Sequence, residues 1–256
     1  MPFPRVATGL TAAIACLVLA AGLGAQSSAT VGLPPATEIV ARHVEAIGGA
    51  EAYASIASIH ARGTFSVPAQ NIVAAFELYA ARPNRSLTRV TVPGVGRIEN
   101  GYDGTHGWTL SPISGPELLG GRQLTELAEE AWFDAVLHGP RHIREMETLE
   151  ETVFDGRRAW KLRVVFPSGR EQLEYFDLAT GLQIGAESTR TTPQGMIPTV
   201  SILRDYEPFG SLLQATTFVQ RALGFEQVVR ITTCEYNTVD PASFDLPAEI
   251  AALVRQ

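Results

Sequence analysis

The sequence contains almost no cysteine and almost no lysine. Its two cysteines are Cys16 and Cys234, and Cys16 lies in an apolar N-terminal segment. If that segment is removed, Cys234 has no partner, so we expect no internal disulfide. The basic residues are nearly all arginines, scattered along a chain of net charge −7. The absence of a basic cluster argues against nucleic acid as a partner and against a polybasic membrane patch.

The sequence signatures of common catalytic sites are also missing. There is no GxSxG, HExxH, GxxxxGK[ST] or GxGxxG motif, and no CxxC pair for a zinc ribbon. His138 and His142 are four residues apart, but Gly139-Pro140 between them cannot hold the helical geometry that a metal-binding pair would use. We therefore predict a protein that is not an enzyme and that needs neither a metal nor a cofactor.

The first 29 residues have the pattern of a secretory signal peptide. Arg5 is followed by an apolar run from about residue 10 to 23 and then by small residues, with plausible cleavage after Ala25 or Ala29. The run is shorter than the ~20 residues that a membrane-spanning helix needs. We therefore expect a removed signal at residues 1–29 and an exported, periplasmic protein.

Two alternatives to simple cleavage are open. The apolar run could be retained as an anchor, or Cys16 could carry a lipid, because Ala13-Ile14-Ala15 loosely resembles a lipoprotein cleavage motif. The run continues beyond Cys16, and the usual leucine three residues before the cysteine is missing, so we favour cleavage. No later segment resembles a linker, and we expect residues 30–256 to form a single domain.

Most of this domain has the two-residue period of β-strands. Apolar and polar residues alternate from Ile59 to Val67 and again from Ala159 to Phe166. Turn residues such as Asp103-Gly104 and Asp155-Gly156 separate such segments at intervals of ~8–12 residues. Strands do not alternate with helices, so a parallel sheet is not expected. We predict a mainly β (α+β) fold, a strongly curved antiparallel half-barrel of about ten to eleven strands with two or three capping helices.

Helical patterns occur near the start, in the middle and at the end of the domain. Apolar residues recur at helical spacing between Ile39 and Ile47, from Leu124 to Leu137, and from Pro247 to Val254. The middle helix is expected to place its carboxylates in solvent, and residues 112–121 before it are predicted to form a loop because they are rich in Gly and Pro. The acidic residues concerned are Glu126, Glu129, Glu130 and Asp134.

A curved sheet whose concave face is only partly filled would bind an apolar ligand. Acyl chains gain ~0.8 kcal/mol for each buried CH₂ group. The helix face with Trp132 and Phe133 would act as a lid. The pattern does not distinguish such a hollow from a closed core. The candidate lining residues are Phe65, Phe76, Leu78, Trp108, Trp160, Leu162, Val164 and Tyr175.

Six motifs, taken in order, resemble a known family. They are AIGGAEAYASIASIHARGTF, YDGTHGWTLSP, DGRRAWKLRV, FDLATGLQIGAES, LRDYEPFG and DPASFDLP. Their order and spacing are similar to those of the periplasmic lipoprotein-carrier superfamily (LolA/LolB type), especially its uncharacterised outer-membrane lipoprotein-sorting-like branch. The resemblance covers about residues 37–247. It implies an open antiparallel half-barrel with an apolar hollow for acyl chains. The cargo-gripping residues of the carriers do not align with positions here, so none is transferred.

These observations lead to three hypotheses of different kinds. The first is non-catalytic periplasmic binding of lipid or lipoprotein acyl chains, for transport or sorting toward the outer membrane, with a possible membrane-protein donor or acceptor. The second is an envelope sensor or interaction module that regulates a membrane partner. The third is a lipid-acting hydrolase, which would need a nucleophile and a base that the sequence does not reveal; loss of esterase activity on changing His106 or His142 would revive it.

Overall fold

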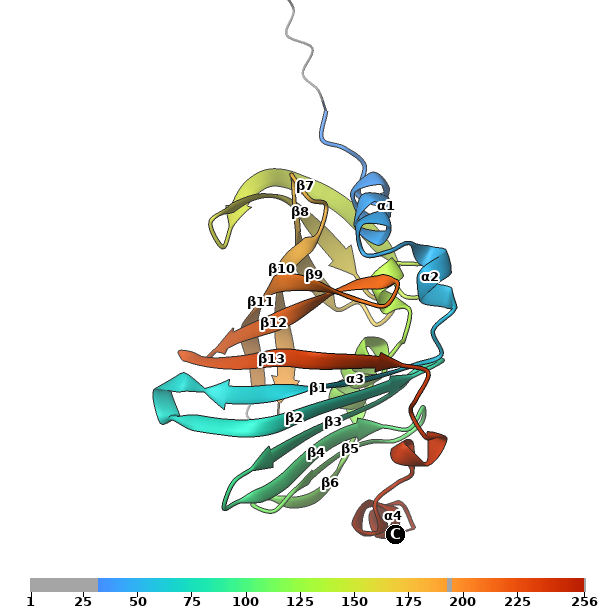
Figure 1. Ribbon diagram of the computed structural model, residues 1–256, viewed down its shortest axis with the longest axis vertical. Helices are drawn as coiled ribbons and strands as arrows, with labels where there is room; N and C mark the ends of the chain where they lie inside the picture. The colour runs from blue at the N-terminus through green and yellow to red at the C-terminus, as the bar shows by residue number, and fades with distance from the viewer. Residues whose placement is uncertain (1–31, 193–194, 256) are drawn as a thin grey trace, which may run out of the picture. The chain divides into compact units, whose positions relative to one another are not determined.

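The computed structural model describes residues 32–192 and 195–255, and the predicted signal at 1–29 lies outside them. Residues from Leu33 onward form one compact unit built on a single antiparallel sheet (Figure 1). No helix within the described ranges is long and apolar enough to cross a membrane.

The sheet is open and curved, and its strands follow an uninterrupted antiparallel order. That order is β6-β5-β4-β3-β2-β1-β13-β12-β11-β10-β9-β8-β7. Two local meanders, β1 to β6 and β7 to β13, therefore meet where β1 pairs with β13. The strands are β1 (Ser58–Val67), β2 (Ile72–Ala81), β3 (Arg85–Val92), β4 (Gly96–Tyr102), β5 (Gly107–Ser111), β6 (Gly115–Leu119), β7 (Glu145–Phe154), β8 (Arg157–Val165), β9 (Glu171–Asp177), β10 (Gln183–Thr192), β11 (Gly195–Phe209), β12 (Leu212–Ala222) and β13 (Phe225–Tyr236).

The described residues contain 13 strands, more than the predicted ten to eleven. The segment predicted as a Gly- and Pro-rich loop contains β6, the edge strand of the first meander. Pro116 lies opposite Leu110 of β5. Proline has no N–H to donate, but an edge strand needs hydrogen bonds on one side only, so proline is tolerated there. The mainly β, antiparallel and curved architecture is confirmed.

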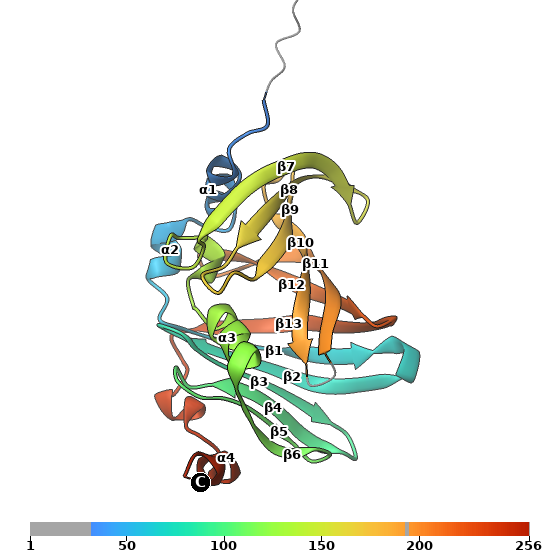
Figure 2. The same cartoon turned by 180° about the vertical axis from the view of Figure 1, so that it is seen from behind.

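The helices are few and short. They are α1 (Ala36–Ala46), α2 (Ala50–Ala54), α3 (Gly121–Glu130) and α4 (Ala248–Val254), with 3₁₀ turns η1 (Pro68–Gln70), η2 (Ala135–Leu137) and η3 (Pro241–Phe244). The chain crosses from β6 at one edge of the sheet to β7 at the other through α3 and η2. Figure 2 shows α3 in front of the central strands, within the curve of the sheet.

The crossover helix is shorter than the predicted Leu124–Leu137. It ends at Glu130, and residues 131–134 form a turn before η2. The backbone N–H of Phe133 donates to the carbonyl of Pro83 at 3.0 Å instead of continuing the helix. This contact between distant parts of the chain overrides the local helical pattern.

Apolar side chains lie on both faces of the sheet. We call the face of the sheet that carries Leu78 the cavity face. The register partner of Leu78 on β1 is Ala61, which therefore lies on the same face. Because neighbouring residues of a strand point to opposite faces, Tyr79 lies on the opposite face. There Leu87 packs with Trp108 against Phe244 and Ile250 from η3 and α4. The opposite face is therefore partly covered by the C-terminal segment.

The hairpin predicted at Asp103-Gly104 is present. The carboxylate Oδ1 of Asp103 accepts hydrogen bonds from the backbone N–H groups of Thr105 and His106, both at 2.7 Å. On the returning strand, Trp108 is 1% exposed and lies directly over Gly101, its register partner. His106 is thus a turn residue held by Asp103, and Trp108 is a core residue.

Candidate functional site

An apolar cavity of about 590 Å³ lies on the cavity face, between the central strands and the segment that follows α3. We call residues 130–136 the roof segment. The roof contributes Glu130, Ala131, Trp132, Phe133, Ala135 and Val136, and Tyr53 of α2 forms part of the wall. The floor consists of Ile59, Ala61, Phe76, Leu78, Ala80, Ser86, Thr88, Gln214, Ala215, Phe218, Val229, Ile231 and Cys234.

The floor comes from five neighbouring strands, β3-β2-β1-β13-β12. Cross-strand register explains why its apolar residues meet: Ala61 lies between Leu78 on one side and Cys234 on the other. The small side chain of Ala61 leaves room above the sheet, and larger residues surround it. The floor carries no charged side chain, which suits an apolar ligand.

The roof segment is fastened to the body by a cluster around Asp134. Its Oδ1 lies 2.9 Å from Nε2 of His142, and its Oδ2 accepts from Nη1 of Arg82 at 3.3 Å. Arg82 also donates to the carbonyls of Ile56 at 2.8 Å and Tyr53 at 3.1 Å. This one arginine therefore links the roof to the segment around α2.

A buried ionisable cluster lies directly behind the roof. Nε2 of His138 is 2.6 Å from Oε2 of Glu174 on β9. Burial alone would lower the pKa of His138, but the charge of Glu174 and its hydrogen bond raise that pKa above its ordinary value. Burial acts in the other direction on Glu174, and the partner's charge lowers the pKa of this carboxyl. We therefore describe the two groups as a charged pair.

His43 of α1 faces the same cluster in a different protonation state. It is 2% exposed, and its ring lies edge-on to Phe176 with centroids 5.3 Å apart. Burial, followed by repulsion from His138, lowers the pKa of His43 to about 4. The neutral ring accepts the backbone N–H of Gln183 at its Nδ1, at 3.2 Å. His43 thus joins α1 to the start of β10.

The carboxylates of α3 were expected to be solvated, but they bind residues of β10 and of the turn between β8 and β9. Glu126 accepts from the hydroxyl of Thr191 at 2.6 Å and from its backbone N–H at 3.0 Å. Glu129 accepts from the backbone N–H of Ser168 at 2.9 Å and pairs with Arg170 at 3.3 Å. The polar face of α3 therefore joins the helix to β10 and to the β8–β9 turn.

Four of the ten predicted site residues lie at the cavity. Phe76 and Leu78 are part of its floor, and Trp132 and Phe133 are part of its roof. Phe65 lies on the cavity face just outside it, opposite Val229 in the β1–β13 register. These five residues are the ones that the structure brings together.

The other predicted lining residues lie elsewhere, for two reasons. Trp108 and Tyr175 are on the opposite face, where Tyr175 stacks on Phe154 with ring centroids 4.0 Å apart. Trp160, Leu162 and Val164 share the cavity face by register, but α1 packs over their part of the sheet. The predicted lining residues were assigned to one apolar face of the sheet. That assignment fails because each face of the sheet carries its own apolar cluster.

Several cavity residues were not predicted. Ile59, Ala61 and Phe65 are separated by even numbers of residues on β1, so they lie on the same face. Following this alternation back from Phe65 would have found the other two. Phe218 and Cys234 come from the other end of the chain, and their role depends on the pairing of β13 with β1. Burial raises the pKa of the Cys234 thiol, which therefore stays protonated near neutral pH.

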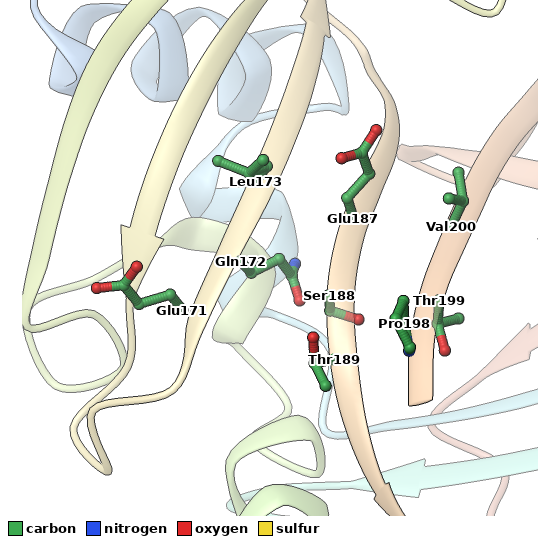
Figure 3. Close-up of a pocket in the computed structure, with 9 residues that line it drawn as sticks. All are labelled: Glu171, Gln172, Leu173, Glu187, Ser188, Thr189, Pro198, Thr199 and Val200. Atoms are coloured by element: carbon green, nitrogen blue, oxygen red, sulfur yellow. The ribbon is translucent and has the colours of Figure 1, made fainter. Parts of the chain in front are cut away.

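Other parts of the described chain are less suited to an apolar ligand. A hollow of about 390 Å³ crosses β9, β10 and β11, and Figure 3 shows Glu171 and Glu187 among its lining residues. Glu171 is paired with Arg163. Within residues 32–192 and 195–255, no group of three or more His, Cys, Asp or Glu side chains is placed to hold a metal ion.

Solved structures share this fold at low sequence identity. A DUF1329 family protein from Desulfovibrio piger matches with a TM-score of 0.59 and 13% identity, covering 85% of this chain and 100% of its own. A putative outer membrane lipoprotein-sorting protein domain from Vibrio parahaemolyticus matches with a TM-score of 0.54 and 14% identity, covering 86% and 98%. A LolA superfamily protein from Nitrosomonas europaea matches with a TM-score of 0.54 and 13% identity, covering 84% and 99%.

The chain therefore has a LolA-like fold, and the predicted resemblance is confirmed at the level of the fold. A scan of protein-family models found no match, and neither did a search of curated protein sequences.

Proposed function

We propose that this protein binds the acyl chains of a lipid or lipoprotein in the roofed cavity, without catalysis, and carries them in the bacterial periplasm toward the outer membrane. The observation that carries the proposal is the apolar floor of a cavity of about 590 Å³ beneath a separate roof segment. This volume lies in the range of about 300–1,000 Å³ found for small-molecule sites. The likeness to a lipoprotein-sorting domain and a LolA superfamily protein supports the same function.

The geometry gives the proposed residues distinct roles. Phe76 and Leu78 would contact the chain from below, and Trp132 and Phe133 from above. Each CH₂ group transferred from water would contribute about 0.8 kcal/mol. The roof is held by the polar contacts of Asp134, by the Phe133 N–H bond to Pro83 and by packing of Phe133 against Tyr53. None of these contacts is part of the strand pairing, so the roof can loosen without opening the sheet. A membrane-protein donor or acceptor that prefers the loosened form would then drive transfer.

The cavity contains its own chemical reporter. Cys234 lies in the floor, and removal of the predicted signal would leave it as the single cysteine. A bound acyl chain should slow its modification by a maleimide. We would purify the exported protein without detergent, identify co-purified lipid by native and solvent-extracted mass spectrometry, and measure Cys234 modification with and without added fatty acid.

Leu78→Glu places a charge in the floor and should abolish both the co-purified lipid and the protection of Cys234. Leu173→Glu is the matched control, since Leu173 is a half-buried strand leucine on the opposite face. If a folded Leu78→Glu protein binds acyl chains as well as the control does, the cavity is not the binding site. Native protein that carries no lipid and takes none from vesicles would contradict the function itself.

A further inference from the structure

Four neighbouring hairpins present exposed apolar residues at one end of the sheet. They are the turns β1–β2, β3–β4, β5–β6 and β12–β13, formed by eight adjacent strands in the order β6 to β12. In an antiparallel meander successive turns alternate between the two ends of the strands, so these four lie on the same side. Figures 1 and 2 show their tips gathered away from α1 and α4. The exposed residues are Val73, Val95, Ile113, Leu223 and Phe225.

We call these four tips the apolar rim and define it as residues 68–73, 92–96, 111–116 and 222–225. Charged residues make up 18% of the whole chain, yet these segments contain no Asp, Glu, Lys or Arg. The turns at the other ends of the same strands carry charges such as Arg82 and Asp103. The two ends of these eight strands therefore differ in polarity.

At two of the four tips, the first charges behind the apolar residues are neutralised by pairing. Arg221 and Glu226 form an ion pair across the β12–β13 hairpin at 2.9 Å. Arg97, directly after the β3–β4 turn, pairs with Glu99 at 2.9 Å. Apolar tips with balanced charges behind them fit the layered polarity of a lipid surface, which is apolar within and zwitterionic at its head groups.

We propose that the apolar rim docks this protein onto the surface of a zwitterionic lipid bilayer. At about 4.8 Å per strand, the row of eight strands spans roughly 30–35 Å. Separate tips of this kind insert side by side into a deformable surface. A protein interface would instead be expected to concentrate aromatic and arginine anchors, and Phe225 is the single aromatic residue of the rim. The lack of basic residues argues against a preference for anionic lipid.

The rim is continuous with the floor of the cavity. Phe225 and Val229 lie on the same face of β13, and Val229 is the register partner of both Phe65 and Phe218. Gln227, opposite Gln220 of β12, lies between Phe225 and Val229 on this face. The apolar side chains therefore lead from the rim to the cavity along β1, through Val67, which pairs with Ile72, and Phe65. The inference does not depend on the proposed function, because the rim would dock with the cavity empty or filled.

The test is flotation of the mature protein with vesicles of phosphatidylcholine and phosphatidylethanolamine. We expect wild-type protein to float with the vesicles, with little change on adding salt or phosphatidylglycerol. Leu223→Glu and Ile113→Glu, which lie on hairpins at different places along the rim, should each weaken binding by about tenfold or more. Both side chains are highly exposed, at 71% and 79%, so the variants should fold normally.

Val153→Glu is the matched control. Val153 is 66% exposed but lies on β7, outside the rim. Its substitution should leave flotation unchanged, and Leu223→Glu should leave the acyl protection of Cys234 unchanged. Wild-type protein that does not float, or a Val153→Glu variant that loses binding as strongly as Leu223→Glu, would overturn the inference. Loss of a protein partner on Leu223→Glu, with no vesicle binding by wild type, would overturn it in favour of a protein interface.

Discussion

Nε2 of His138 lies 2.6 Å from Oε2 of Glu174, and each of the two side chains is 5% exposed. The pair joins the segment behind the roof to β9, deep in the body of the protein. Gln172 also donates to Glu174, at 2.9 Å, so the carboxylate has a second partner. A charged pair of this kind is sensitive to the loss of either member, because the remaining charge stays buried.

His138→Leu should therefore strongly destabilise the protein. It leaves Glu174 buried without its counter-charge, and we expect the free energy of unfolding to fall by about 3–5 kcal/mol. Chemical denaturation at pH 6.5 would measure the change. The double variant His138→Leu, Glu174→Leu removes both charges and should recover much of the loss. Equal loss in the single and double variants would mean that packing, not charge, governs this site.

The dependence of stability on pH should have a maximum near pH 6.5. His43 has an unfolded pKa of 6.5 and a folded pKa of about 4, so the unfolded state binds more protons between these values. Stability from His43 is therefore lost as the pH falls from 6.5 toward 4, by about 3 kcal/mol at most. His138 has a raised folded pKa, so its contribution is complete below 6.5 and is lost as the pH rises through the folded value.

Denaturant unfolding from pH 4.5 to 9 would record this profile. Its acidic limb should flatten in His43→Leu, and its basic limb should flatten in the His138, Glu174 double variant. Glu174 adds a further loss below 4.5, its unfolded pKa, because its folded pKa is lower. An acidic limb unchanged in His43→Leu would contradict the assignment of a neutral, buried His43.

Asp134→Asn should loosen the roof. The neutral amide loses the charge that holds Arg82 and His142, and contacts of this kind contribute about 1.5–3 kcal/mol each. On the proposed function, a bound fluorescent fatty acid should leave about tenfold faster, as measured by stopped-flow displacement with unlabelled fatty acid. Hydrogen exchange of residues 131–137 should also become faster, which gives a readout that needs no ligand.

Asp155→Asn provides the comparison for this roof variant. Asp155 also pairs with an arginine, Arg204, but lies at the β7–β8 turn outside the cavity. It should change neither the release of fatty acid nor the exchange of the roof. Similar effects of the two variants would show that the Asp134 contacts do not hold the roof.

Turns and strands could be predicted from sequence because their signals are local. Asp103-Gly104 encodes its hairpin within a few residues, and the alternation around Trp160 identifies β8. The side of the sheet that becomes a cavity could not be read in the same way. Trp108 and Leu78 both belong to strands with alternating apolar residues, so their local sequence signals are alike. They differ because α4 covers the face that carries Trp108, and the roof segment covers the face that carries Leu78.

The polar side of α3 shows a similar limit. The residue spacing in α3 places Glu126 and Glu129 away from the apolar stripe of the helix. This predicts only that the two carboxylates do not face the surface against which the stripe packs. Their binding to Thr191 and Ser168 arises because the crossover carries the helix past β10. The strand Gly115–Leu119 was hidden for a comparable reason: proline weakens a strand signal, and only the strand's position at the sheet edge makes Pro116 acceptable.

The pairing of β1 with β13 has a consequence for the newly made chain. Until β13 arrives, β1 and β12 each expose a row of unpaired backbone groups, so the unfinished protein has four sheet edges instead of two. Such edges invite pairing between different molecules. If the chain crosses a membrane from its N-terminus, as the proposed location requires, it stays vulnerable to aggregation until β13 has emerged. A chaperone that shields extended segments would be most useful during that interval.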